Sequence, residues 1–238
     1  MNHAADAIEV PMTPAYRGVI RLTTPIMTRW SRLVVTGVEH LPSSGPTLLV
    51  ANHESYWDPI AIAVAARSRR QVRALAKSTL WRVAPIAWLM NGMGHIPIVR
   101  GVTNDAAIST ATQALADGAC IGVFPESTRS LGRSLRARSG AGRLILSVPG
   151  TQIVCVRVVG ATDVVRVPKR PTVRVEFFAP RGGGPQAGED AAALMTRLTA
   201  EIREGAPCAI PGRRRTAAKH RRRLESEVRD RFDAAEDA

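Results

Sequence analysis

Large aromatic rings, cysteines and long apolar runs are all scarce in this sequence. Aromatic residues make up 4% of the 238 residues and hydrophobic residues 45%, an ordinary globular balance with few large rings. No run of 18 apolar residues occurs, so we predict no transmembrane helix. The N-terminus lacks the basic region, apolar core and small-residue cleavage site of a signal peptide, and none is predicted. The length suffices for one sizeable α/β domain.

The three cysteines, Cys120, Cys155 and Cys208, are widely spaced along the chain. Two of them fall in apolar strand patterns, so we expect buried thiols rather than a disulfide or a metal site. No spacing typical of metal ligands appears, and we expect no bound cofactor. The sequence also lacks a Gly-x-Ser-x-Gly elbow, and no cysteine stands in a motif that would activate its thiol. A nucleophile supplied by the protein is therefore not expected.

Lysine is rare, yet the chain is strongly basic. The net charge is +13, carried by 30 arginines and only three lysines. A basic surface of this size favours anionic partners, such as nucleic acid, an acidic membrane or phosphorylated substrates. Genomic base composition alone can produce an excess of arginine over lysine, so the ratio itself is not evidence for phosphate binding.

A histidine and an aspartate follow an apolar run at residues 47–51, which predicts a short buried strand. The motif is Asn52-His53-x4-Asp58, and Pro59 is suited to open the next helix. Imidazole accepts a proton near neutral pH, and a carboxylate that holds one ring nitrogen leaves the other free to work. The spacing therefore predicts that His53 is a general base and that Asp58 orients it.

A second polar motif, Phe-Pro-Glu-Ser-Thr-Arg-Ser at residues 124–130, follows another apolar run at residues 120–123. In parallel α/β sheets, ligands bind beyond the carboxyl ends of the strands, which is where both motifs fall. The arginine of this motif, Arg129, carries a planar fork that can grip a phosphate. Glu126 can bind a substrate hydroxyl or hold Arg129 in place, and pairing of these two residues merely to pin the loop is the structural alternative.

Strand and helix patterns alternate through most of the chain. Candidate strands lie at residues 47–51, 72–77, 95–99, 120–124, 152–159 and 172–178. Candidate helices lie at residues 59–68, 79–90, 104–117, 140–148 and 189–204. This alternation predicts an α/β fold with a largely parallel central sheet flanked by helices. Within it, Asn104 is a predicted N-cap and Gly118 a predicted helix stop.

Both strand-end motifs resemble those of the glycerolipid acyltransferase family, whose best-known members are lysophosphatidic acid acyltransferases. The family's first block, Asn-His-x4-Asp, is matched by residues 52–58, and its third, Phe-Pro-Glu-Gly-Thr-Arg-Ser, by residues 124–130, with Ser127 in place of glycine. The second block is similar to residues 94–100, which end in Arg100, and the fourth resembles residues 153–156 loosely. The resemblance covers about residues 14–180.

The resemblance implies an O-acyltransferase. Its donor would be acyl-CoA or acyl carrier protein, and its acceptor a lysophospholipid, first of all 1-acylglycerol 3-phosphate. Arg129, assisted by Arg100, would bind the acceptor phosphate. Thr128 and Ser127 would support the loop, and Ser127 would be strained if the family's glycine has a positive φ. Lys77, at the end of a predicted strand, is a further candidate for neutralising phosphate.

The two ends of the chain carry candidate membrane-binding segments. Residues 1–13 are predicted to be disordered. Residues 14–36 mix apolar residues and arginines at helical spacing, with a break at Pro25, which suits helices at a membrane interface or packing on the core. The acyltransferase domain is assigned to residues 37–208. Residues 209–238 form a basic tail in which the spacing of apolar residues suits a short amphipathic helix; attraction to an anionic bilayer and a solvated helix or disordered tail are the two alternatives. We therefore expect a peripheral protein on the cytoplasmic side of the plasma membrane.

Three other functions are compatible with parts of the sequence. The same fold and base would also serve another lysolipid, a glycolipid or an amine as acceptor. A hydrolase would result if water replaced the acceptor. A basic module that binds nucleic acid or membranes fits the charge, but no helix-turn-helix, zinc or aromatic-rich RNA-binding signature is present and both motifs would stay unexplained. Nucleic acid is therefore not an expected partner.

Overall fold

A seven-stranded sheet forms the centre of the computed structural model, which describes residues 10–99, 105–165, 170–210, 217–223 and 225–226. The strand order is β1-β7-β6-β2-β5-β3-β4, and every neighbouring pair is parallel except β6 and β7. The strands are β1 (Val34–Thr36), β2 (Thr47–Ala51), β3 (Val72–Lys77), β4 (Ile96–Ile98), β5 (Cys120–Val123), β6 (Gln152–Val159) and β7 (Arg174–Phe178). This confirms the predicted α/β fold with a largely parallel sheet.

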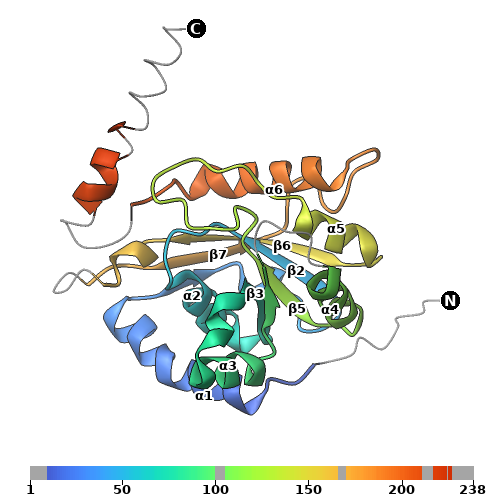
Figure 1. Cartoon of the computed structure of the whole chain (residues 1–238), viewed down its shortest axis with the longest axis horizontal. Coiled ribbons are helices and arrows are strands. Elements are labelled where there is room, and N and C mark those ends of the chain that lie inside the picture. The colour runs from blue at the N-terminus through green and yellow to red at the C-terminus, as the bar shows by residue number, and fades with distance from the viewer. Residues whose placement is uncertain (1–9, 100–104, 166–169, 211–216, 224, 227–238) are drawn as a thin grey trace, which may run out of the picture.

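Helices cover both faces of the sheet (Figure 1). They are α1 (Pro14–Pro25), α2 (Asp58–Ala65), α3 (Ala84–Gly92), α4 (Asp105–Ala116), α5 (Gly140–Ser147) and α6 (Ala191–Gly205). The first three pack on one face and the last three on the other. Alternate residues of β2 belong to the two cores, because successive side chains of a strand point to opposite faces: Leu49 packs toward α1 and α2, and Leu48 toward α4 to α6.

Most predicted elements are present, with three differences, one of which is that the helix predicted at 59–68 ends as α2 at Ala65 and continues as a 3-10 turn, Ala66–Ser68. The strand β1 was not predicted, because three residues are too few to show a periodic pattern. The helix predicted at 79–90 is divided into a 3-10 segment, Ser78–Arg82, and α3, which starts at Ala84 with Pro85 in its first turn. Proline suits the first turn and not the interior of a helix, so it marks the start of α3. Gly118, at φ +84°, follows α4 as predicted, whereas Asn104 and Arg100 lie outside the described residues.

The N-terminal helix α1 belongs to the core as much as to the surface. Tyr16 is fully buried, and its hydroxyl accepts the backbone N–H of Val72 at the start of β3 at 3.2 Å. The opposite side of α1 exposes Arg17, Arg21 and Leu22. At the predicted break the chain continues into a π-helical turn, Ile26–Trp30. Pro25 lacks the N–H that an α-helix would use there, which explains the change of winding.

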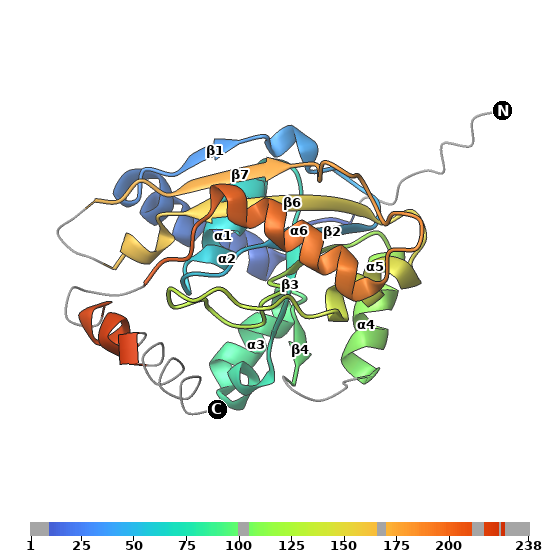
Figure 2. The ribbon, with the colours of Figure 1, turned by 90° about the horizontal axis from the view of Figure 1, so that it is seen from above.

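The last helix of the domain, α6, crosses the sheet over β6 and β2 (Figure 2). Asp190 caps its N-terminus by accepting the backbone N–H of Ala192 at 2.9 Å and that of Ala193 at 2.7 Å. Residues 217–223 of the basic tail are helical, within the stretch where a helix was considered possible. None of the described helices combines the length and apolar character needed to cross a membrane.

Candidate active site

The two predicted motifs meet at one edge of the sheet because their strands are parallel neighbours. In the register of β2 and β5, Val50 lies opposite Val123, so the residues that follow both strands emerge side by side. The imidazole of His53 stacks on the ring of Phe124, with the ring centroids 4.2 Å apart and the planes inclined by 20°. The fold therefore unites two motifs that are about 70 residues apart in the sequence, as expected for a site beyond the carboxyl ends of strands.

His53 and Asp58 form a hydrogen-bonded pair. The Nδ1 atom of His53 lies 2.9 Å from Oδ2 of Asp58, which is the first residue of α2. The same carboxylate oxygen accepts the backbone N–H of Glu54 at 2.6 Å and that of Ser55 at 2.7 Å. Burial raises the pKa of the Asp58 carboxyl, while the contacts with His53 and the two amides act in the opposite direction. Asp58 is thus a fully buried acceptor held by three donors.

This geometry sets the tautomer that a base needs. A carboxylate oxygen can only accept, so in the neutral ring Nδ1 carries the proton and Nε2 keeps its lone pair. His53 is 8% exposed, and the pair sits at the sheet edge rather than deep in the core. The predicted arrangement of a histidine with an orienting carboxylate is present, and the arrangement can take a proton from a hydroxyl brought to Nε2.

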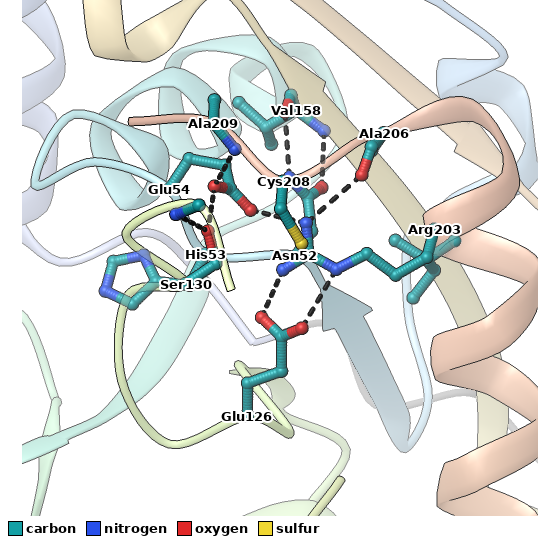
Figure 3. Close-up of polar contacts among 12 residues, drawn as sticks. Asn52, His53, Glu54, Glu126, Ser130, Val158, Arg203, Ala206, Cys208 and Ala209 are labelled. Atoms are coloured by element: carbon teal, nitrogen blue, oxygen red, sulfur yellow. Dashed lines mark hydrogen bonds and ion pairs between the residues drawn. The ribbon is translucent and has the colours of Figure 1, made fainter. Parts of the chain in front are cut away.

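Asn52, the first residue of the motif, anchors the loop to the neighbouring strand β6. Its Nδ2 donates to the backbone oxygen of Val158 at 2.9 Å, and its Oδ1 accepts the backbone N–H of Val158 at 2.8 Å (Figure 3). The amide side chain therefore continues the pairing of β2 with β6 where the backbone turns away. An asparagine is suited to this position because its side chain offers a donor and an acceptor together.

Glu126 pairs with an arginine that the sequence did not single out. Its two carboxylate oxygens accept from Arg203 near the end of α6, through Nε at 2.9 Å and through one terminal nitrogen. The suggested pairing of Glu126 with Arg129 is therefore wrong. Burial raises the pKa of Glu126, and the Arg203 guanidinium lowers it in part.

Arg129 turns instead toward Tyr56. Its guanidinium carbon lies 3.9 Å from the centroid of the Tyr56 ring, and a terminal nitrogen donates to the tyrosine hydroxyl at 3.1 Å. Within the part of the chain that the structure describes, no carboxylate lies at ion-pair distance from Arg129. Among the described residues, no carboxylate therefore neutralises the charge of Arg129. An arginine that binds phosphate must keep its charge available in this way.

The remaining predicted residues occupy less central positions. Ser127 has φ +59°, the left-handed conformation in which a glycine is unstrained, so the family's glycine is replaced here at a strained position. Thr128 and Lys77 are exposed, with Lys77 at the end of β3. Arg100 lies outside the described residues, so its distance from the site is not defined.

Two charged residues of the site were missed by sequence reasoning, Glu54 and Arg203. Glu54 is 4% exposed and accepts from Arg203, from the hydroxyl of Ser130, and from the backbone N–H of Ala209 at 2.8 Å (Figure 3). Arg203 is 149 residues from Glu54, and it directly follows the apolar stripe of its helix. No local pattern distinguishes it from the other arginines of the chain. The one sequence signal for this pair was the carboxylate of Glu54, directly after the motif histidine.

An apolar cavity of about 340 Å³ lies between the sheet and α1, α2 and α3. Phe124 and Tyr56 line it, so the ring that stacks on His53 and the ring under Arg129 are also its walls. The other walls are mainly aliphatic, including Ile20, Leu49, Ile60, Ala63, Ala74, Leu80, Leu89 and Met93. His95 is a polar exception, and burial lowers its pKa to about 4, so the ring is neutral near pH 7. A pocket of this size and character suits an apolar ligand.

A His/Asp pair at the carboxyl edge of a mostly parallel sheet, next to an apolar cavity, defines an enzyme-like α/β site. A family model described as Acyltransferase matches residues 32–159, more than half of the 238-residue chain. The chain belongs to the acyltransferase family. The resemblance drawn from the sequence motifs is thereby confirmed.

Relatives of known name are similar at modest identity. A 1-acyl-sn-glycerol-3-phosphate acyltransferase of Borreliella burgdorferi is 29% identical over 126 residues, which cover 52% of this chain and 49% of that protein. A chloroplast protein of the same name from Arabidopsis thaliana is 25% identical over 137 residues, covering 56% of this chain and 38% of the relative. The chain thus spans less than half the length of these relatives.

A solved structure shares the fold. The crystal structure of the 1-acyl-sn-glycerophosphate acyltransferase PlsC from Thermotoga maritima aligns with a TM-score of 0.63 and 20% sequence identity, covering 80% of this chain and 78% of that one. At this identity the likeness establishes the fold alone.

Proposed function

We propose that this protein transfers a fatty acyl group from a thioester donor, acyl-CoA or acyl carrier protein, to the free hydroxyl of 1-acylglycerol 3-phosphate, which yields phosphatidic acid. The observation that carries the proposal is the His53–Asp58 pair, joined at 2.9 Å and set beside an apolar cavity through Phe124. Family membership and the names of two similar proteins support the same reaction class.

The reaction needs no nucleophile from the protein. His53 accepts the proton of the acceptor hydroxyl as its oxygen attacks the thioester carbonyl carbon, and Asp58 stabilises the resulting imidazolium. When the tetrahedral intermediate collapses, the carbon–sulfur bond breaks and the thiolate leaves. The imidazolium returns its proton to the sulfur, so the ester and the free thiol form while His53 is restored.

The acyl chain of the donor is proposed to occupy the apolar cavity. Its walls are almost entirely carbon, and burial of a chain there would remove each methylene from water at a gain of about 0.8 kcal/mol. Because Phe124 touches both the cavity and His53, a chain in the cavity would bring its carbonyl end toward the base. The cavity therefore gives a physical reason for a fatty acyl donor.

The acceptor phosphate is proposed to bind Arg129. This arginine stands at the cavity wall on Tyr56 and has no carboxylate partner among the described residues. A planar guanidinium grips a phosphate with two parallel hydrogen bonds, and stacking on a ring orients its plane. Arg100 and Lys77 stay further candidates for the same charge.

A membrane surface is the proposed source of the lipid acceptor. Exposed apolar side chains lie on α1, at the start of the π-helical turn after it, and on the segment that leads into and through α3: Leu22, Ile26, Leu80, Val83, Ile86 and Trp88. Exposed arginines of the same segments, Arg17, Arg21 and Arg82, would meet anionic headgroups. Helices α1 and α3 also form walls of the cavity, so a lipid would enter it from this side.

One incubation tests the proposal. Purified protein is mixed with palmitoyl-CoA, or in a parallel series with palmitoyl-acyl carrier protein. Each acceptor is added separately: lysophosphatidic acid, other lysolipids, a glycolipid or an amine. Free thiol and lipid product are followed together. Phosphatidic acid formed in step with free thiol is the expected result. Product from another acceptor alone would move the function to that acceptor, and thiol release without product would indicate a hydrolase. Absence of thiol release with both CoA and carrier-protein donors would overturn the proposal.

A further inference from the structure

Arg203 binds both motif loops at once. Near the end of α6 it holds Glu126 with two nitrogens and Glu54 with a third, and its third nitrogen also donates to the backbone oxygen of Ala206 at 3.1 Å (Figure 3). Glu54 belongs to the loop after β2 and Glu126 to the loop after β5. One guanidinium from a third element thus binds the two halves of the site together.

The bridged residues are tied directly to the proposed base. The backbone N–H of Glu54 donates to the Asp58 oxygen that holds His53. The hydroxyl of Ser130 donates to Glu54, and the backbone N–H of Ser130 donates to the backbone oxygen of His53 at 2.9 Å. A shift of either loop would therefore move the His53 ring relative to Phe124 and the cavity.

We infer that Arg203 is a positioning residue for acyl transfer, which fixes the loop of His53 against the loop of Glu126 and Arg129 without touching the substrate. The inference rests on the proposed function. Misplacing reacting groups by about 1 Å can cost about 100-fold in rate, so a residue with this role affects turnover strongly. It also assigns Glu126, the glutamate of the second motif, to holding the site together.

The charges of the network explain why an arginine is required. Glu54 and Glu126 are each 4% exposed, and the side chain of Arg203 is 16% exposed. Two nearly buried carboxylates share one cation, and within the described part of the chain the thiol of Cys208 also faces them, with its pKa raised by burial. Removing one partner of a buried ion pair leaves an uncompensated charge, which is far costlier than losing an exposed pair.

The sign of the pH effect follows from this arrangement. Without Arg203, the pKa of Glu126, which burial already holds above the ordinary value of 4.5, rises further, and Glu54 is left as a nearly buried carboxylate without its cation. The folded state then holds a proton on Glu126 that the unfolded state has released, so its stability falls as pH rises from about 4.5 through the raised pKa of Glu126. The Arg203→Met protein should consequently lose more stability at pH 8 than at pH 6.

A matched control lies on the same helix. Arg197 of α6 pairs with Glu189 through Nε at 2.8 Å and a terminal nitrogen at 2.9 Å, and it contacts neither motif loop in the described structure. Arg197→Met therefore removes a bidentate ion pair of similar geometry from α6 while leaving both loops in place. Any general effect of losing an arginine from this helix will appear in both variants.

The first measurement is steady-state kinetics with palmitoyl-CoA and lysophosphatidic acid at pH 6 and pH 8. Arg203→Met should lose about 100-fold in kcat at pH 8 and clearly less at pH 6, with the KM for the donor changed less than kcat. Arg203→Lys should recover only part of the loss, because an ammonium cannot hold both carboxylates with a planar fork. Arg197→Met should stay close to the wild type at both pH values.

The second measurement needs no activity. Urea unfolding at pH 6 and pH 8 should reveal an extra loss of stability at pH 8 for Arg203→Met and none for Arg197→Met. Adding Glu54→Gln to Arg203→Met should reduce that extra loss of stability. Glu54→Gln alone should instead lower the free energy of unfolding, because a neutral amide would then face the Arg203 guanidinium. This reversal of sign is specific to a charge bridge.

The outcomes separate the inference from the proposed function. Wild-type kcat in a folded Arg203→Met protein at both pH values would overturn the positioning role. Equal losses in the Arg203 and Arg197 variants would do the same, because the effect would then belong to the helix. A wild-type protein without acyl transfer would refute the proposed function, and the unfolding experiment would still decide whether Arg203 bridges the loops.

Discussion

The rings of His53 and Phe124 stack at 4.2 Å, although the two residues come from different motifs. Phe124 covers a face of the imidazole, and Asp58 holds its Nδ1 edge at 2.9 Å. The ring is thus oriented in two independent ways, by a flat hydrophobic contact and by a hydrogen bond. Because Phe124 also lines the cavity, this one contact joins the proposed base to the proposed acyl site.

Loss of the base should abolish transfer without unfolding the protein. We expect His53→Ala to lower kcat by about 10²–10⁴, since this is the usual contribution of a positioned general base. Asp58→Asn should also be severely impaired, because an amide cannot hold the imidazolium. The control is His40→Ala, which removes an exposed histidine. Near-wild-type turnover by a folded His53→Ala protein, judged by its thermal melt, would refute the mechanism.

Removal of Arg129 should weaken binding of the acceptor and leave binding of the donor nearly unchanged. A charge-assisted partner of a bound phosphate is worth about 1.5–3 kcal/mol, so Arg129→Ala should raise the half-saturating concentration of lysophosphatidic acid roughly tenfold or more. Arg129→Lys should restore only part of the affinity. Saturation curves for both substrates check this, with Arg143→Ala on α5, an exposed arginine of the opposite face, as the control.

The reverse pattern for Arg129, with weaker donor saturation and an unchanged acceptor curve, would assign this arginine to the phosphates of the donor or to the loop itself. The acceptor role would then pass to Arg100 or Lys77.

Restoring glycine at position 127 should stabilise the protein. Ser127 has φ +59°, and a left-handed conformation costs an L-residue roughly 1–2 kcal/mol. Part of that gain is offset by the greater freedom of glycine in the unfolded chain, so Ser127→Gly should raise the free energy of unfolding by about 0.5–1 kcal/mol. Thr128→Gly, next in the same loop but without a positive φ, should lower it by a similar amount. Urea unfolding measures both, and destabilisation by Ser127→Gly would contradict the strain argument.

The exposed apolar surface of α1 and α3 should bind anionic vesicles. Sedimentation with vesicles containing phosphatidylglycerol should pull down the protein, less so at high salt, because salt screens the attraction of arginines to the surface. Leu22 and Trp88 are 76% and 74% exposed, and replacing either with alanine should weaken partition by about tenfold. Leu146→Ala on α5, where the side chain is 47% exposed, is the matched control.

Removal of residues 212–238 should also weaken vesicle binding while leaving transfer on detergent-dispersed substrate intact. Equal partition onto neutral and anionic vesicles at every salt concentration would exclude the electrostatic part of this prediction.

The sequence by itself determined the features that depend on neighbours along the chain. The contact between His53 and Asp58 spans five residues, and a strand end followed by a proline-started helix suffices to make it. The strands β2 and β6 were predicted at their observed bounds, because buried runs between turn residues are a local signal. The motifs and their order along the chain were sufficient to indicate the family.

Tertiary structure alone decided the partners of the charged residues. From the sequence alone, Glu126 could pair with Arg129, three residues away, or equally with any other arginine of the chain. Arg203, 77 residues away, binds it because α6 packs across β6 and β2 and its last turn brings a guanidinium between the two carboxylates. The cavity has the same origin: its walls come from three helices and three strands, and its shape exists only once they pack.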